Sequence, residues 1–157
     1  MSAAPAPEAE QPDAWRARLL TTPAQIRALL ERTHRIAVLG VKTPKSGAPA
    51  YYVADHAHRA GYEVIPVPVY YPEMRELFGN PVYRTLAAIP GDIDLVDVFR
   101  RPQDIPPHVD DILAKRPRAV WFQSGIRHDA VAERLARAGI EVVQDRCLLV
   151  ELQRIGR

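Results

Sequence analysis

Short apolar runs recur along the chain and are separated by longer segments of mixed polarity. The runs read RIAVLG (35–40), YEVIPV (62–67), IDLVDVF (93–99), RAVWFQ (118–123) and IEVVQ (140–144). A nearly continuous apolar run of this length is typical of a parallel strand that is buried on both faces. The pattern therefore predicts five strands.

The segments between these runs carry apolar residues at helical spacing. Val53, Ala57 and Ala60 recur in this way before Gly61, a residue that favours a helix end. Further helices are predicted after the Thr22-Pro23-Ala24-Gln25 start signal, around 107–115, from Val131 to Ala138, and from Leu148 to Ile155. Alternating strands and helices predict an α/β fold, a single Rossmann-like domain whose mainly parallel sheet has helices on both faces.

Length and composition agree with one globular domain. The chain has 157 residues, of which 25% are charged and 47% are hydrophobic, values typical of a soluble protein with one core. Residues 1–14 contain mainly Ala, Pro, Glu and Gln, so a disordered N-terminal tail is expected there. Residues 15–157 are then the folded domain.

Charge and cysteine content narrow the function classes. A net charge of +2 gives no reason to expect nucleic acid as a partner. No run of 18 apolar residues suggests a membrane span, and the first residues lack the pattern of a secretory signal. The single cysteine, Cys147, excludes an internal disulfide and fits a reducing compartment, so a cytoplasmic location is expected.

Ligands of such sheets bind beyond the carboxyl ends of the strands, where the strand order reverses. If the 35–40 strand is central, three loops wall this crevice, namely 41–50, 99–102 and 123–127. We therefore expect the binding residues in these loops.

The usual nucleotide motifs are missing from the first loop. The sequence contains no G-x-x-x-x-G-K-[ST], and after Gly40 the next glycine is Gly47, so G-x-G-x-x-G is absent. The second strand runs into VIPVPVYYP, without the acidic residue that binds the ribose of NAD. A small NAD(P)-dependent or nucleotide-using enzyme therefore becomes the less favoured alternative.

The first loop nevertheless has features of an anion site. Lys42 and Lys45 lie on it, and Pro49 follows near the first turn of the predicted helix. A helix N-terminus attracts anions through its free N–H groups and its dipole. A solvated turn with two surface lysines is the competing interpretation.

Three motifs then indicate a known family. They are VDVFRRPQDIP (96–106), VWFQSGIR (120–127) and GIEVVQDRCLLVE (139–151), supported by GYEVIPV (61–67) and PAYYVA (49–54). In this order they resemble the stand-alone CoA-binding domain family, which is related to the N-terminal domain of the succinyl-CoA synthetase α subunit. The resemblance spans roughly residues 30–155.

This resemblance implies a Rossmann-like fold that binds coenzyme A or a short acyl-CoA at the switch point. The residues that it assigns to the diphosphate are Gly40, Val41, Lys42, Thr43, Lys45 and Pro49. Val67 and Pro68 are assigned to the adenosine end. The residues assigned to the nucleotide or its pantetheine arm are Phe99, Arg100, Arg101, Gly125 and Ile126. Many members carry Arg and Ser where this chain has Ala48 and Ala50, which leaves the two lysines as substitutes.

Several neighbouring side chains allow more than one role. Of Tyr51 and Tyr52, one is expected to pack inside and the other to border the ligand; we assign Tyr51 to the site. One of Arg100 and Arg101 is expected to bind phosphate, while the other pairs with a carboxylate such as Asp97 or Asp104.

The last predicted helix begins at Asp145-Arg146-Cys147. Asp145 is expected to cap this helix, with Arg146 paired to the scaffold. Cys147 is expected to be a small buried residue, and a mixed disulfide with the CoA thiol is the alternative. Asp110 and Asp111 are expected on a solvated helix face.

No catalytic or metal-binding set is evident. His56 and His58 are two residues apart on a predicted helix and so point in different directions. A phosphohistidine role for His128 would need a catalytic domain that is absent. We therefore expect a non-enzymatic module that binds CoA as a carrier, a sensor or a partner module, associated with a protein partner or with a second copy of itself. A CoA-dependent catalyst completed by a separate subunit is a further alternative.

Overall fold

The computed structural model describes residues 11–157 and contains the predicted parallel sheet. Its strands are β1 (Arg35–Leu39), β2 (Glu63–Val67), β5 (Leu95–Val98), β6 (Ala119–Phe122) and β7 (Glu141–Val143). They lie in the order β2-β1-β5-β6-β7, and every neighbouring pair is parallel. The α/β fold predicted from the sequence is confirmed.

The connections around β1 create the expected switch point. From β1 the chain crosses to β2 on one side, and later returns to β5 on the other side of β1. The three central strands β1, β5 and β6 are buried over almost their whole length, because helices cover both faces of the sheet. The crevice between the ends of β1 and β5 is thus the expected binding position.

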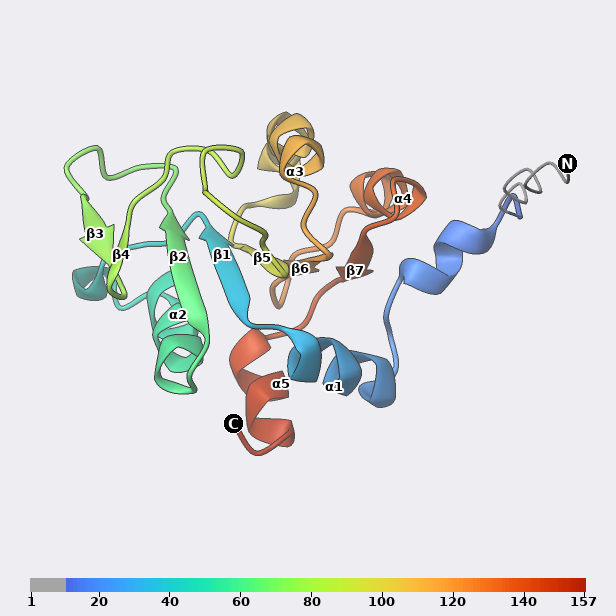
Figure 1. The fold of residues 1–157 in the computed structure, drawn as a ribbon, viewed down its shortest axis with the longest axis horizontal. Helices are drawn as coiled ribbons and strands as arrows, with labels where there is room; N and C mark the ends of the chain where they lie inside the picture. The colour runs from blue at the N-terminus through green and yellow to red at the C-terminus, as the bar shows by residue number, and fades with distance from the viewer. Residues whose placement is uncertain (1–10) are drawn as a thin grey trace, which may run out of the picture.

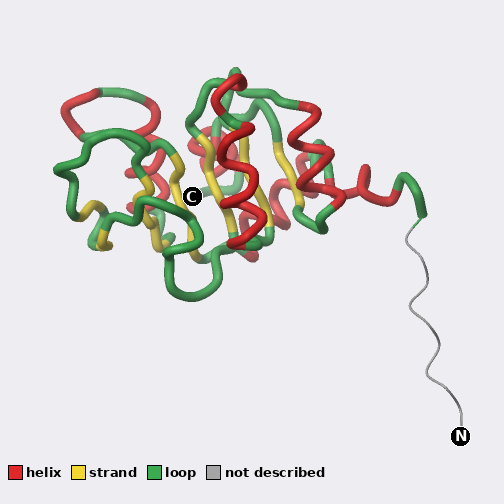
Figure 2. Tube along the Cα trace, turned by 90° about the horizontal axis from the view of Figure 1, so that it is seen from above, coloured by secondary structure: helices red, strands yellow, loops and turns green. Residues whose placement is uncertain are grey.

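Within residues 11–157, five α-helices form the two outer layers. One face carries α1 (Pro23–Arg32), α2 (Pro49–Arg59) and α5 (Leu148–Arg154), and the other carries α3 (Val109–Lys115) and α4 (Asp129–Arg137) (Figure 1). Two separate clusters of buried apolar residues fill the spaces between the sheet and these layers. Seen from above in Figure 2, helices lie over the strands of the sheet. The described residues contain no helix that is long and apolar enough to cross a membrane.

The start of α1 follows its sequence signal. Thr22 Oγ1 accepts a bond from Gln25 N at 3.2 Å, and Gln25 Oε1 accepts one from Thr22 N at 3.1 Å. This reciprocal pair satisfies two backbone donors that a helix start otherwise leaves free.

A small antiparallel hairpin, β3 (Glu76–Leu77) and β4 (Asn80–Pro81), was not predicted. It protects the edge strand β2, since Asn80 Nδ2 donates to Val64 O at 2.9 Å and Tyr83 N donates to Pro66 O at 3.1 Å. Two-residue strands leave too short an apolar pattern for a sequence prediction. Covering an exposed strand edge in this way prevents pairing with other chains.

The opposite edge is covered by the N-terminal segment. A 3₁₀ helix runs over Ala14–Arg18 and buries Trp15, and Leu20 N donates to Val142 O of β7 at 2.8 Å. Of the predicted tail, residues 1–10 lie outside the described residues, while Ala14 belongs to this helix.

Candidate functional site

A cleft of about 580 Å³ opens at the carboxyl ends of the sheet, where the strand order reverses. It is formed by the loops after β1, β5 and β6 and by the starts of α2 and α5. Its lining residues are Lys42, Ala48, Pro49, Ala50, Tyr52, Phe99, Arg100, Arg101, Pro102, Gln123, Ser124, Gly125, Ile126 and Cys147. The three loops expected to form the site do come together.

Gly40 holds the first loop against the loop after β5. Its φ is +88°, and a Cβ at this position would lie 2.4 Å from Phe99 O. Any side chain would therefore push these two walls apart. Gly40 and the buried Val41 are not among the lining residues, so their role in the structure is to fix the loops. A direct contact of either with the diphosphate stays a prediction.

The loop then makes a 3₁₀ turn at Pro44–Ser46 and enters α2. The N-cap residue of α2 is Ala48, whose side chain offers no oxygen, and no side chain caps the helix. Ala48, Pro49 and Ala50 all line the cleft. The partial positive charge of this helix start is consequently directed at the cleft.

Arg100 and Arg101 have different surroundings. Arg101 Nε donates to Asp104 Oδ2 at 2.7 Å, and this bond lowers the pKa of the Asp104 carboxyl. Arg100 lines the cleft, and its Nε is buried without a hydrogen-bond partner among residues 11–157. Burial and the nearby positive charge of Arg100 lower the pKa of His108. The expected division of roles thus has Arg101 as the residue paired with a carboxylate.

Gln123 connects the floor of the cleft to the core. Its Nε2 donates to Asp97 Oδ1 at 2.7 Å, and its Oε1 accepts a longer bond from Leu148 N at 3.4 Å. Asp97 is completely buried, and this burial raises its pKa to about 7 despite the bond from Gln123. Asp97 therefore does not pair with either arginine. The sequence offered Asp97 only as a possible ion-pair partner and gave no sign of this amide.

The loop before α5 is bonded to the loop after β6. Gly125 N donates to Asp145 Oδ1 at 2.6 Å, and Trp121 Nε1 donates to Arg146 O at 2.7 Å. The expectation that Asp145 caps α5 is wrong, because its φ of +55° turns the side chain toward Gly125, and Cys147 is the N-cap residue. Arg146 does pair with the scaffold, donating to Thr21 O at 2.8 Å.

Cys147 is half-buried and lines the cleft. It is thus accessible from the cleft, in contrast to the buried position expected for it.

The two tyrosines at the start of α2 face different neighbours. Tyr51 stacks on Phe78 of the hairpin, with ring centroids 5.8 Å apart. Tyr52 is 49% exposed and lines the cleft. The structure therefore brings Tyr52, and not Tyr51, to the cleft, because one residue along a helix turns the side chain by about 100°.

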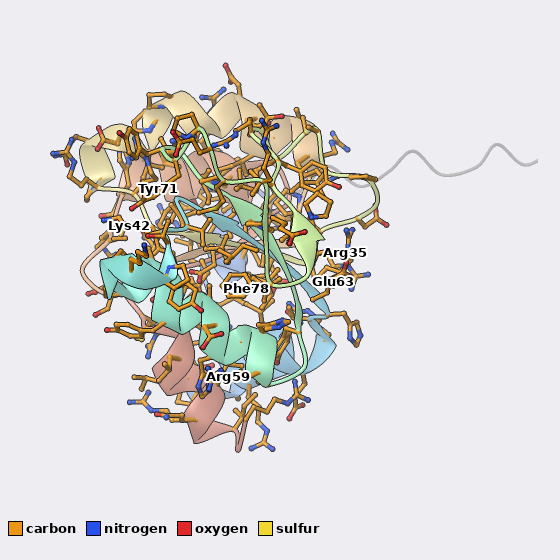
Figure 3. The ribbon with its side chains drawn as sticks, turned by 90° about the vertical axis from the view of Figure 1, so that its left-hand side faces the viewer. Arg35, Lys42, Arg59, Glu63, Tyr71 and Phe78 are labelled. Carbon is orange, nitrogen blue, oxygen red and sulfur yellow. The ribbon has the colours of Figure 1, made fainter. Side chains whose placement is uncertain are left out.

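A second hollow of about 420 Å³ lies beside the same loop. Its lining residues are Thr43, Pro44, Tyr70, Tyr71, Pro72, Glu73, Met74, Glu76 and Leu77. Figure 3 shows Lys42 and Tyr71 near the same end of α2, and Phe78 beside this helix. Val67, at the end of β2, is buried and does not line either hollow, nor does Pro68 or the exposed Lys45.

Other predicted side chains have structural roles. His128 Nδ1 accepts from Val131 N at 3.1 Å and so caps α4. The expectation of a solvated face is wrong for Asp111, whose carboxylate accepts bonds from Leu86 N and Ala87 N at 2.7 and 3.0 Å. In the described part of the chain, no three His, Cys, Asp or Glu residues are arranged to hold a metal ion.

The comparison with protein families agrees with this geometry. A model of the CoA binding domain matches residues 34–153. The chain belongs to this CoA-binding domain family. The family resemblance of the motifs after β5, β6 and β7 is thereby confirmed.

Similar proteins share nearly the whole CoA-binding domain. YneT, an uncharacterized protein of Bacillus subtilis (strain 168), is 32% identical over 127 residues, which cover 81% of this chain and 91% of YneT. A Thermus thermophilus protein solved as cell-free ID.343 is 41% identical with a TM-score of 0.78, covering 86% of this chain and 99% of that one.

The fold also occurs inside a larger enzyme. An acetyl-coenzyme A synthetase 1 from Ca. Korarchaeum cryptofilum is 15% identical with a TM-score of 0.58; the match covers 69% of this chain and 25% of that one. At this identity the likeness concerns the fold alone.

Proposed function

We propose that the protein binds coenzyme A, or a short acyl-CoA, in the cleft at the carboxyl ends of β1 and β5. The observation that carries the proposal is the unpartnered, buried Nε of Arg100 in the lining of this cleft. A buried donor without a partner is costly in a folded protein. A phosphate oxygen of the ligand would supply the missing acceptor.

Two further features support an anion at this position. The N-terminus of α2 has no side-chain cap and belongs to the cleft, as does the exposed Lys42. Together with Arg100 they give three sources of positive potential for the diphosphate of CoA. In this proposal Lys42 contributes to phosphate binding, whereas Lys45 would act only through its longer-range charge.

The rest of the cleft suits the remainder of the ligand. Phe99, Pro102 and Ile126 provide apolar surface, which fits a pantetheine arm that is largely apolar with a few amides. The adenosine would extend past Thr43 toward the second hollow, near the end of β2.

We further propose that the protein does not catalyse a reaction by itself and serves as a carrier, a sensor or a partner module. The basis is the content of the cleft, where Cys147 is the one strong nucleophile among the lining residues and no histidine accompanies it. The cytoplasmic location expected from the single cysteine stays a prediction.

Thermal unfolding with a panel of ligands tests the proposal. CoA and acetyl-CoA should raise the midpoint in a concentration-dependent manner, because a ligand that binds only the folded state stabilises it. NAD, NADP and ADP should raise it less, since none of them has the pantetheine arm. A shift with NADP in the absence of any shift with CoA would contradict the proposal and favour the nucleotide-using enzyme.

A further inference from the structure

A fully buried carboxyl lies directly behind the floor of the cleft. Asp97, in β5, has no exposed surface, and its Oδ1 accepts the bond from Gln123 Nε2 at 2.7 Å. Its second oxygen, Oδ2, has no partner among the residues that the structure describes. The carboxyl is therefore poorly solvated in its charged form and well suited to hold a proton.

Gln123 joins this carboxyl to the cleft. Its side chain is 4% exposed, yet it contributes to the lining. The same amide accepts a bond from Leu148 N at the start of α5, next to the lining residue Cys147. One buried side chain thus separates Asp97 from any ligand that occupies the cleft.

Charged groups are scarce around Asp97. Burial is the main cause that raises its pKa to about 7, and the bond from Gln123 opposes it, with no contribution from a charged neighbour. Its register partners on the two neighbouring strands are the buried apolar residues Val38 of β1 and Trp121 of β6.

Ionisable groups on neighbouring elements are paired or lie at the cleft. Arg35 of β1 pairs with Glu63, and Glu151 of α5 pairs with Arg146 and Arg154. Cys147, Arg100 and Lys42 line the cleft.

We propose that Asp97 takes up a proton when CoA binds, so that the affinity of the protein for CoA falls as the pH rises through neutrality. The inference rests on the proposed function, since it concerns the same cleft. Two effects of the ligand act in the same direction. CoA displaces water from the cleft floor, and its diphosphate brings negative charge close to the carboxyl; both disfavour the carboxylate.

The sign of the pH dependence follows from proton linkage. Well below neutrality Asp97 is protonated with or without ligand, so the affinity for CoA is highest and does not change with pH. Above the pKa of Asp97 in the ligand-free protein, the carboxyl is ionised before the ligand binds. Binding then requires Asp97 to take up a proton from the solvent, so the affinity declines as the pH rises. If ligand binding raises the pKa of Asp97 by about one unit, the affinity for CoA falls about tenfold between acid and alkaline conditions.

Titration calorimetry in two buffers of different ionisation enthalpy measures this proton directly. The preferred probe is dephospho-CoA, because it lacks the 3′-phosphate, whose own proton titrates near neutrality. At about pH 7.5 the wild-type protein should take up a substantial fraction of one proton per ligand, whereas Asp97→Asn should take up much less. Asp92→Asn, a change of an exposed carboxyl near the amino ends of the strands, should behave as wild type.

The outcomes separate this inference from the proposed function. Equal proton uptake by wild type and Asp97→Asn, with binding intact in both, would overturn the role of Asp97. Failure of the wild-type protein to bind CoA or dephospho-CoA at any pH would instead overturn the proposed function.

A measurement on the wild-type protein covers the case in which Asp97→Asn fails to fold. Infrared difference spectra should show that the band of a protonated carboxyl grows when dephospho-CoA is added at about pH 7.5. No growth of this band, with the ligand bound, would contradict the proposal.

Discussion

The two sides of the cleft satisfy their polar groups in opposite ways. On the bonded wall, made by Gln123–Gly125 and Asp145–Cys147, the main polar groups bond to each other or to the core, as in Gln123 with Asp97 and Gly125 with Asp145. On the open wall, made by Lys42, the start of α2 and Arg100, the helix has no cap and Arg100 Nε has no partner in the described chain.

This difference indicates that one wall contributes to folding stability and the other to ligand binding. Polar groups that are hydrogen-bonded within the fold contribute to its stability, because removing one partner leaves the other buried without a hydrogen bond. Groups without a partner contribute little to folding and are available for a ligand. Changes on the bonded wall should therefore lower stability, and changes on the open wall should lower affinity for CoA.

The largest effect is expected on the bonded wall, from Gln123→Leu. Leucine has a similar size but cannot bond, so Asp97 loses its donor and Leu148 N loses its acceptor in a buried place. We expect the free energy of unfolding of the ligand-free protein to fall by about 3 kcal/mol, as measured by urea denaturation.

Gln103→Leu is the matched control for this change. Gln103 is exposed in the loop after β5, and its replacement should alter the free energy of unfolding by less than about 0.5 kcal/mol. If both variants were equally stable, the distinction between the two walls would be lost.

A smaller effect, on binding alone, is expected on the open wall from Arg100→Gln. The shorter neutral side chain cannot supply the charged donor to phosphate, so the Kd for CoA should rise about thirtyfold, equivalent to about 2 kcal/mol. Calorimetric titration with CoA measures the change. Stability without ligand should be retained or slightly raised, because this buried donor has no partner among residues 11–157 and its burial is unfavourable.

Arg101→Gln provides the comparison for Arg100. Arg101 is already paired with Asp104 in an exposed position, so its loss should change the Kd much less. The assignment of phosphate binding to Arg100 would be wrong if Arg101→Gln weakened CoA binding more strongly than Arg100→Gln did.

The smallest effects are expected from the two lysines. Lys42 is exposed at the cleft, so Lys42→Ala should weaken CoA binding about threefold at low ionic strength, and the loss should shrink as salt screens the charge. Lys45 is exposed and lies outside the lining, so Lys45→Ala should have a weaker effect. Titrations at two salt concentrations measure both, and a loss for Lys45→Ala that equals the loss for Lys42→Ala would remove the distinction between them.

Most of the fold could be predicted from the sequence because its signals are local. The runs at 35–40 and 93–99 are apolar enough to require burial on both faces, and Thr22 with Gln25 marks a helix start by itself. The hairpin at 76–81 escaped prediction because its two-residue strands exist only through contacts with β2.

The site was less accessible to prediction. The sequence indicated which loops would meet, and it pointed to Lys42, Arg100 and Gly125 in the cleft. It gave Tyr51 in place of Tyr52, since the direction of a side chain depends on how far α2 is rotated against the sheet. It also missed Gln123, because an amide at the end of an apolar strand has no distinctive pattern.

By itself the sequence determined the order of strands and helices, the helix starts and the family, because each depends on residues that are near one another in the chain. The tertiary structure alone decided that Arg101 pairs with Asp104 while Arg100 Nε has no partner within residues 11–157. It also decided that Asp97 bonds to Gln123 and that Asp145 bonds to Gly125. Each of these depends on contacts between loops that follow different strands. Such contacts arise only when the parallel sheet aligns the carboxyl ends of those strands at one edge.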